Sequence, residues 1–256
     1  MPCGKGHAQL PHGIAGCRAL GLQIPGEGLA LGAALCEGGA ARNLLAMASS
    51  HFCAAERQFR TPLSYGAVRT PTAQWTATAA GCCLLQPQGE GVGIAAATFG
   101  RVQDYQVKDI NNMGAAMAPA AASTLLHYFK DTGTEPQEFD CIYTGDLGQV
   151  GSQLLRELLA AEGLLIKNHV DCGCILFDAN EQSVKSGGSG PGCCAAVLCG
   201  HILPRLRRGS QKRVLFTATG ALMSQTIFLQ KETIPAVAHL VELRAPEKEK
   251  IGRAHV

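Results

Sequence analysis

The sequence predicts a layered α/β fold, because short apolar runs typical of buried strands alternate with longer segments that have helical spacing. The chain has 256 residues, of which 46% are hydrophobic and only 16% are charged, so it can bury a sizeable core. Its 31 glycines and 12 prolines indicate frequent turns between short elements. These three observations favour a compact protein of one or two domains.

The expected elements follow from apolar spacing and from helix-ending residues. The expected strands, in chain order, are residues 44–48, 139–143, 174–177, 214–218 and 240–243. The expected helices are 28–37, one with Pro119 in its first turn, one with Ser152 as its N-cap, and 192–208. Pro204 is expected to kink or split the last helix.

The charge pattern gives no sign of nucleic-acid binding. The formal net charge is +2, and no basic tail or stripe is present. The uncharged stretch 214–230 contains threonine, serine, glutamine and glycine, so we do not expect it to span a bilayer. No signal peptide is readable in the first 25 residues. Residues 1–26 show no periodicity, and the tail 247–256 resembles a translated sequencing adapter, so we expect both ends to be artefacts outside the fold.

The twelve cysteines lie within apolar segments, which predicts buried free thiols in a reducing compartment. Neither the adjacent pairs nor Cys172 and Cys174 have the spacing of a structural zinc site, and we expect no metal or cofactor.

One internal similarity suggests two related halves. Residues 39–50 align with residues 209–220 at a shift of 170. Both segments pass from a helix end through glycine and a basic turn into an apolar strand followed by small polar residues. This match predicts two similar units that pack about a pseudo-twofold axis.

Several polar residues come directly after expected strands, where α/β proteins bind ligands. Ser50 and His51 follow the first strand, and Arg57 and Arg60 come shortly afterwards. Their imidazole and guanidinium groups suit carboxylates, although a core histidine and a solvated charged helix face are equally simple interpretations.

Two carboxylates and a glycine loop add to these candidates. Asp146 and Asp171 stand beside glycines at strand ends, where aspartate usually satisfies backbone amides. The loop 186–192, which includes Gly188 and Ser189, precedes a helix, and its amides could hold an anion. It lacks the spacing of a phosphate-binding or dinucleotide motif, so a flexible loop is an open alternative. Cys193 and Cys194 are expected to be core residues.

Residues 27–245 resemble the stage V sporulation protein AD family of spore-forming bacteria. The matching blocks, in order, are Ser49-Ser50-His51, residues 55–60, 65–66, 113–122, 144–147, 150–152, 169–173, 187–190, 218–222 and 230–235. The last block adds Glu232 to the candidate ligand-binding residues. The resemblance implies a thiolase-like fold with two pseudo-twofold-related βαβαβ halves, of which residues 27–130 would be the truncated first and 131–246 the second.

The resemblance also implies a function. Family members bind dipicolinic acid, free or as its calcium chelate, and serve its uptake into the developing spore and its release at germination. Expected partners are other stage V sporulation A channel proteins at the spore inner membrane, and a second copy in a homodimer.

Departures from the family pattern limit the expected chemistry. The family's first strands and cysteine-bearing segment have no match here, and neither Cys17 nor Cys36 is in its place. We therefore expect no enzymatic activity, exposed sheet edges, and a chain that is poorly stable or aggregates. Two alternatives stay open: an acyltransferase or condensing enzyme that acts on coenzyme A thioesters, which needs a thiolate and a histidine base, and a structural subunit without a small ligand.

Overall fold

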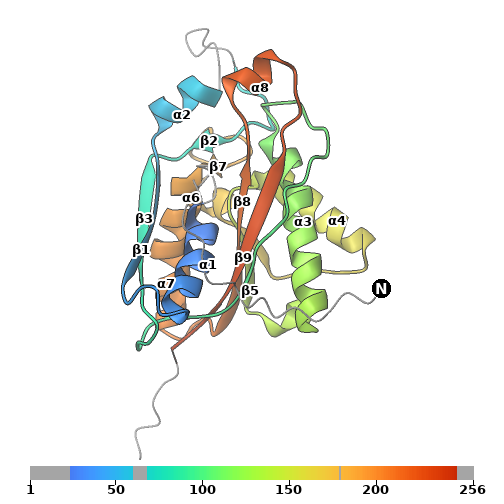
Figure 1. The fold of residues 1–256 in the computed structure, drawn as a ribbon. Helices are drawn as coiled ribbons and strands as arrows, with labels where there is room; N and C mark the ends of the chain where they lie inside the picture. Colours follow the sequence, from blue (N-terminus) through green and yellow to red (C-terminus); the bar gives the residue numbers. More distant parts are fainter. Residues whose placement is uncertain (1–23, 60–67, 179, 247–256) are drawn as a thin grey trace, which may run out of the picture.

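The computed structural model describes residues 24–59, 68–178 and 180–246, and within these ranges it leaves out the side chains of residues 24 and 57–59. The elements form four layers: a two-stranded sheet, a layer of helices, a five-stranded sheet, and a second layer of helices (Figure 1). The inner helices α1 and the run from α6 to α7 lie between the sheets, and α3 and α4 cover the far face of the larger sheet. This confirms the predicted layered α/β architecture.

The five-stranded sheet is mixed, and its strand order is β4-β9-β8-β5-β6. Its strands are β4 (Gly93–Thr98), β5 (Cys141–Thr144), β6 (His169–Asp171), β8 (Arg213–Ala221) and β9 (Ala236–Arg244). Strands β5, β6 and β8 are mutually parallel, whereas β9 runs antiparallel to both β8 and β4. Every residue of β8 after the first is buried, because helices cover both faces of the sheet.

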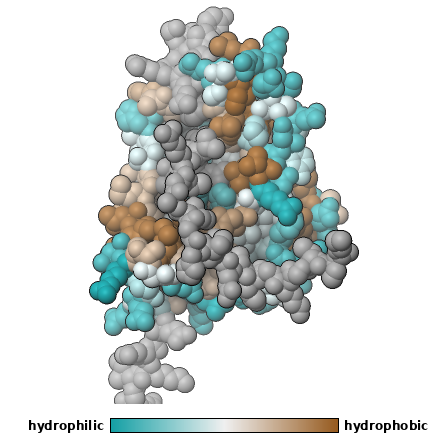
Figure 2. Space-filling view, in the orientation of Figure 1, coloured by the Kyte–Doolittle hydropathy of each residue, from teal (hydrophilic) through white to brown (hydrophobic). Residues whose placement is uncertain are grey.

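The smaller sheet consists of β1 (Leu44–Ser50) and β3 (Ala79–Leu85), which pair antiparallel. Strand β1 was predicted as a buried strand, and this is wrong: its burial alternates, and Leu45 and Met47 are about 60% exposed. Leu84, opposite Leu45, is also exposed. Figure 2 shows hydrophobic residues on the left of the molecule, over the region that β1, β3 and α1 occupy in Figure 1. Among the described residues, helices pack on only one face of this sheet, and nothing covers the other face.

The remaining elements are α1 (Ile24–Glu37), α2 (Phe52–Phe59), β2 (Trp75–Thr76), α3 (Met113–Thr132), η2 (Pro136–Glu138), α4 (Gly148–Ala161), α5 (Cys172–Leu176), β7 (Gly188–Ser189), α6 (Pro191–Val197), η3 (Leu198–Ile202), α7 (Leu203–Arg207) and α8 (Gln225–Leu229). Of these, α1, α3 and α4 have more than ten residues, and α6, η3 and α7 follow one another without a break. The others are short. No helix in the described ranges has the length and apolar character needed to cross a membrane.

Three helix predictions need correction. Pro119 lies inside α3 rather than in its first turn, and the N-cap is Asn112, whose side chain accepts from the amide of Ala115. Helix α4 begins four residues before Ser152, which is buried inside it. In place of the predicted strand 174–177 the chain forms helix α5, since a short apolar run does not distinguish a buried strand from a buried helical turn.

The helix predicted at 192–208 is continuous from α6 to α7, but its middle part, η3, is a π-helix. Pro204 has no amide hydrogen and so leaves the carbonyl of Gly200 without its usual helical donor. The wider turn begins just before this point, where the amide of Leu203 donates to the carbonyl of Leu198.

The predicted internal similarity has a structural basis at the two helix ends. Gly39 and Gly209 have φ angles of 73° and 74°, a left-handed conformation that favours glycine. After them, the amides of Ala40 and Ala41 donate to the carbonyl of Leu35. In the second segment, the amides of residues 210 and 211 donate in the same way to the carbonyl of residue 205. The same helix end therefore leads into β1 and β8, each of which pairs antiparallel with a later strand.

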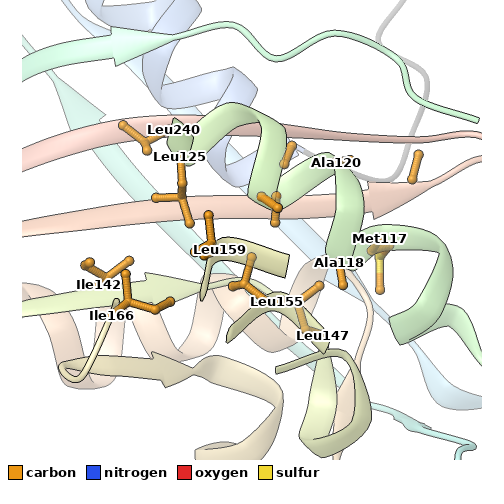
Figure 3. Packing of buried hydrophobic residues seen from close by; sticks show 14 of the residues in the cluster. Met117, Ala118, Ala120, Leu125, Ile142, Leu147, Leu155, Leu159, Ile166 and Leu240 are labelled. Carbon is orange, nitrogen blue, oxygen red and sulfur yellow. The ribbon is translucent and has the colours of Figure 1, made fainter. Parts of the chain in front are cut away.

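The larger core cluster lies between α3, α4 and the five-stranded sheet. Figure 3 shows Leu125 of α3, Leu155 and Leu159 of α4 and Ile142 of β5 as members of this cluster, and all four side chains are fully buried. A second cluster fills the space between the sheet, α1 and the run from α6 to α7. The ten described cysteines are all free, and five of them are buried. The prediction of buried thiols is wrong for the other five: Cys53 and Cys82 are exposed, and Cys83, Cys174 and Cys199 are partly exposed.

Candidate functional site

A cavity lies where the C-terminal ends of β1 and β8 meet β7 and the start of α6. The space between its lining atoms, with the open solvent at its mouth included, is about 670 Å³. Its lining consists of Ser50, Ala55, Thr76, Ile110, Met113, Met117, Asp146, Ser189, Gly190, Pro191, Gly220, Ala221 and Met223. Ser50 and Gly220 are the paired positions of the internal repeat, so the two related strands end at the same hollow.

Asp146 is the buried carboxylate of this cavity. Its Oδ2 accepts from the amide of Gly190 at 2.8 Å and from the hydroxyl of Ser189 at 3.2 Å, and its Oδ1 accepts from Thr219 Oγ1 at 3.0 Å. Burial raises the pKa of Asp146, because the loss of water outweighs the hydrogen bonds from Gly190, Thr219 and Ser189 that favour the charged form. The cavity therefore holds a carboxyl group that takes up a proton more readily than an exposed aspartate.

Ser50, also in the lining, connects three segments of the chain. Its Oγ donates to the carbonyl of Ala77 at 2.8 Å and accepts from the amide of Gly192 at 3.0 Å. A side chain on Gly192 would collide with the carbonyl of Ala79 and with Ser50, so the glycine allows the start of α6 to approach β1 closely. Ser50 thus fixes the end of β1 against the start of α6.

One sequence hypothesis proposed that the amides of the glycine loop 186–192 could hold an anion. The structure shows that two of these amides already have partners within the protein. The amide of Gly190 binds Asp146, and that of Gly192 binds Ser50. Gly188 and Ser189 form β7, which pairs with β2. The loop is therefore an ordered wall of the cavity, and internal oxygens take the place that an anion would have.

Asp171 lies outside the cavity and organises the start of α4. It accepts from Thr144 Oγ1 at 2.6 Å and from the amides of Leu147 and Gly148, each at 2.9 Å. Burial raises its pKa to about 6 against the lowering effect of Thr144, and the nearby charge of Asp146 adds to the increase. Asp171 lines a second, more open hollow beside His169 and Arg156. Its contacts are those of a helix-capping carboxylate.

The other predicted residues do not join the cavity lining in the described part of the chain. His51 is exposed, and Glu232 is exposed in the turn after α8. Arg57 belongs to α2, but its side chain lies outside the description, and Arg60 lies outside the described residues altogether. The structure therefore brings together Ser50, Asp146 and Ser189, with Gly188 adjacent, and leaves His51, Asp171 and Glu232 elsewhere.

Helix α2 is fastened over the cavity by residues that sequence reasoning missed. Glu56 is fully buried and accepts from Arg69 and from Thr76 Oγ1, both at 3.1 Å. The guanidinium of Arg69 lies 4.1 Å from the ring centre of Trp75, and Phe52 stacks on the same ring. This cluster holds Ala55, on the same helix as Glu56, against the cavity.

The methionines of the lining were also missed. Met113, Met117 and Met223 are three of only five methionines in the chain. Met113 and Met117 are four residues apart, so they share one face of α3, and this spacing was a readable signal. Met223 follows β8 and is brought to them only by the tertiary fold.

Comparisons with solved structures give the class of fold. AbyA1, a tetronic acid condensing enzyme, matches with a TM-score of 0.50 and 15% identity, over 84% of this chain and 64% of that chain. 3-Oxoacyl-[acyl-carrier-protein] synthase III from Aquifex aeolicus VF5 matches with a TM-score of 0.49 and 13% identity, over 84% and 62%. The mixed sheet with antiparallel β9, the repeated helix–strand unit and the cavity at the strand ends define a protein of the thiolase-like fold.

Sequence comparison gives the family. Residues 23–244 match Stage V sporulation protein AD (SpoVAD). The Stage V sporulation protein AD of Bacillus subtilis (strain 168) is 43% identical over 214 residues, which make up 83% of this chain and 63% of the relative. The chain belongs to the stage V sporulation protein AD family, and it spans just under two thirds of the length of that relative.

Proposed function

We propose that this sporulation protein binds dipicolinic acid, free or as its calcium chelate, in the cavity at the ends of β1 and β8. In this proposal it serves uptake of the acid into the developing spore, and its release at germination, together with stage V sporulation A channel proteins. It would act at the periphery of the spore inner membrane, alone or as a homodimer.

The observation that carries the proposal is the combination of groups in one cavity. Met113, Met117 and Met223 offer thioether and methyl surface to a flat aromatic ring, with which methionine sulfur makes favourable contacts. Ser50 and Ser189 bring hydroxyl groups to the same space. An apolar wall with a few placed polar groups suits a small planar ring that carries polar substituents.

The raised pKa of Asp146 supports binding of an acidic ligand. Burial raises the pKa of Asp146, so less negative charge opposes a carboxylate that enters the cavity. We propose that Arg57 and Arg60 supply long-range positive charge, because they follow Ala55, a lining residue of α2, by two and five positions in the sequence. Positions 55 and 57 lie on different faces of a helix, so the proposal for Arg57 is attraction of the dianion and not direct contact with it.

A matched pair of substitutions on α2 tests the location of the binding site. Ala55→Leu places extra volume in the cavity, whereas Ala54→Leu adds the same volume at the neighbouring exposed position. We expect Ala55→Leu to weaken dipicolinate binding by about tenfold or more in calorimetric titration, corresponding to roughly 1.4 kcal/mol. Ala54→Leu should bind like the unchanged protein. Equal affinities of the two variants would place the ligand elsewhere.

Further titrations test the ligand and the charge. Titration with benzene-1,3-dicarboxylate, which has the shape of dipicolinate without the ring nitrogen, tests the contribution of that nitrogen to binding. Titration of dipicolinate in the presence and absence of calcium distinguishes binding of the chelate from binding of the free acid. Arg57→Gln and Arg60→Gln should each weaken binding of the free dianion. If unchanged protein binds neither the acid nor its chelate, the proposed function is wrong.

We also propose that the protein binds its ligand without catalysis. In the described lining there is neither a cysteine nor a histidine. Cys193 and Cys194 lie near the cavity, but burial raises the pKa of both thiols well above the usual range, which keeps them protonated. Release of free thiol from an acyl-coenzyme A would instead support the condensing-enzyme alternative.

A further inference from the structure

A pair of cysteines lies away from the cavity, where the small sheet meets the inner helices. Cys83 is in β3 and Cys199 is in the π-helix η3, 116 residues further along the chain. Their Sγ atoms are 3.9 Å apart. A disulfide bond needs about 2.0 Å, so the two sulfurs must approach by about 1.9 Å.

The surroundings of the pair allow both access and movement. Both side chains are partly exposed, and both line a small apolar hollow between α1, β1, β3 and the start of η3. A π-helical turn is a weakly preferred local conformation, so residue 199 lies in a part of the helix that can adjust more readily than a regular turn. Cys82, the next residue before Cys83, points to the opposite, exposed face of β3.

The two thiols differ in chemical character. The hydrogen bond from Cys83 lowers the pKa of Cys199 to about 6, and the positive charge of Arg207 contributes in the same direction. The same interaction raises the pKa of Cys83. Cys199 is therefore the more acidic thiol of the pair. Its Sγ–H also donates to the carbonyl of Cys82 at 3.7 Å, and loss of this proton would give the attacking thiolate.

We propose that Cys83 and Cys199 form a reversible redox pair that a low-molecular-weight disulfide oxidises to an intramolecular disulfide. In the first step, the Cys199 thiolate attacks one sulfur of the small disulfide, a mixed disulfide forms on Cys199, and one small thiolate leaves. In the second step, Cys83 gives its proton to solvent and its sulfur attacks Cys199 Sγ, which expels the second small thiolate. Two protein thiols are oxidised and one small disulfide is reduced to two thiols.

The bond would join β3 covalently to the helical run that begins at the cavity. Strand β3 already packs against this run, since a side chain on Gly81 would lie 2.6 Å from the carbonyl oxygen of Ala195. Oxidation would thus fix an existing contact and would not require the layers to be rearranged.

The test uses oxidised and reduced glutathione in varied ratios on the whole chain. After the free thiols are blocked with N-ethylmaleimide, peptide mass spectrometry identifies the linked cysteines. We expect a linked Cys83–Cys199 peptide pair that disappears again with excess reduced glutathione. If the exposed Cys53 acquires glutathione while Cys83 and Cys199 stay unlinked, the proposal is wrong.

Three variants separate the roles. Cys83→Ser should stop at the first step and accumulate glutathione on Cys199, whereas Cys199→Ser should leave Cys83 unmodified. Cys82→Ser is the matched control and should form the Cys83–Cys199 bond like the unchanged protein. Linkage of Cys82 to Cys199 at a comparable yield would overturn the assignment. The alkylation rates of Cys83 and Cys199 in the unchanged protein show which thiol is more reactive without any variant.

Discussion

Asp171→Asn tests the electrostatics at the start of α4. The folded protein gives Asp171 a pKa of about 6, above the ordinary value of 3.8, chiefly because the carboxyl group is buried. The folded state therefore holds this proton more tightly than the unfolded state. The resulting stabilisation is fully present below the unfolded pKa and is lost as pH rises through about 6. At about 1.36 kcal/mol for each pKa unit, the difference is about 3 kcal/mol.

Urea unfolding, followed by circular dichroism at several pH values from about 4 to about 7.5, measures this effect. The free energy of unfolding of the unchanged protein should fall over this range by about 2–3 kcal/mol more than that of Asp171→Asn. At low pH folded Asp171 is itself protonated and, like the asparagine amide, keeps one carbonyl oxygen as acceptor, so the two proteins should have similar stability there.

Asp131→Asn, at an exposed position in the last turn of α3, is the control and should keep the pH dependence of the unchanged protein. Parallel curves for the unchanged protein and Asp171→Asn would refute the argument that burial raises the pKa of Asp171.

Two further predictions concern packing. Leu155→Ala should lower the free energy of unfolding by about 2–5 kcal/mol, because Leu155 is fully buried between α4 and the sheet, whereas Leu158→Ala on the outer face of α4 should have an effect below about 1 kcal/mol. Urea midpoints compare the two, and equal losses would contradict the assigned core. Leu45→Lys combined with Leu84→Glu should reduce self-association in sedimentation velocity, because these cross-strand partners form part of the open apolar face. Unchanged association would show that this face is not responsible.

The strands that the sequence predicted well are those with two covered faces. Strand β8 is a continuous apolar run because helices pack on both of its sides, and such a run is readable without knowledge of its neighbours. Strands β3 and β4 were missed, since their alanine-, glycine- and cysteine-rich sequences have little intrinsic strand preference. Helix α5 was predicted as a strand because five residues are too few to show a helical period.

The candidate cavity was partly predictable for a related reason. Ser50 is the last residue of β1 and Asp146 comes two residues after β5, and it is a general rule that α/β folds bind ligands at strand ends. The partners of backbone amides are not encoded in any local pattern, so the contact between Gly190 and Asp146 could not be foreseen. Met223 reaches the cavity from a segment about 100 residues beyond Met117, and only the assembled sheet brings the two together.

The repeated turn at Gly39 and Gly209 allows the local opening of two related strands to be compared. The helix ends at Gly39 and Gly209 have the same backbone hydrogen bonds, but the strands that follow them differ in burial. Both faces of β8 are covered, whereas only one face of β1 is covered in the described part of the chain. Amide hydrogens of β1 should therefore exchange with deuterium well before those of β8. Because the helix ends are alike, the difference between the two rates reports the combined protection that β8 gains from a second covering layer and a second neighbouring strand, within a single chain and under identical solvent conditions.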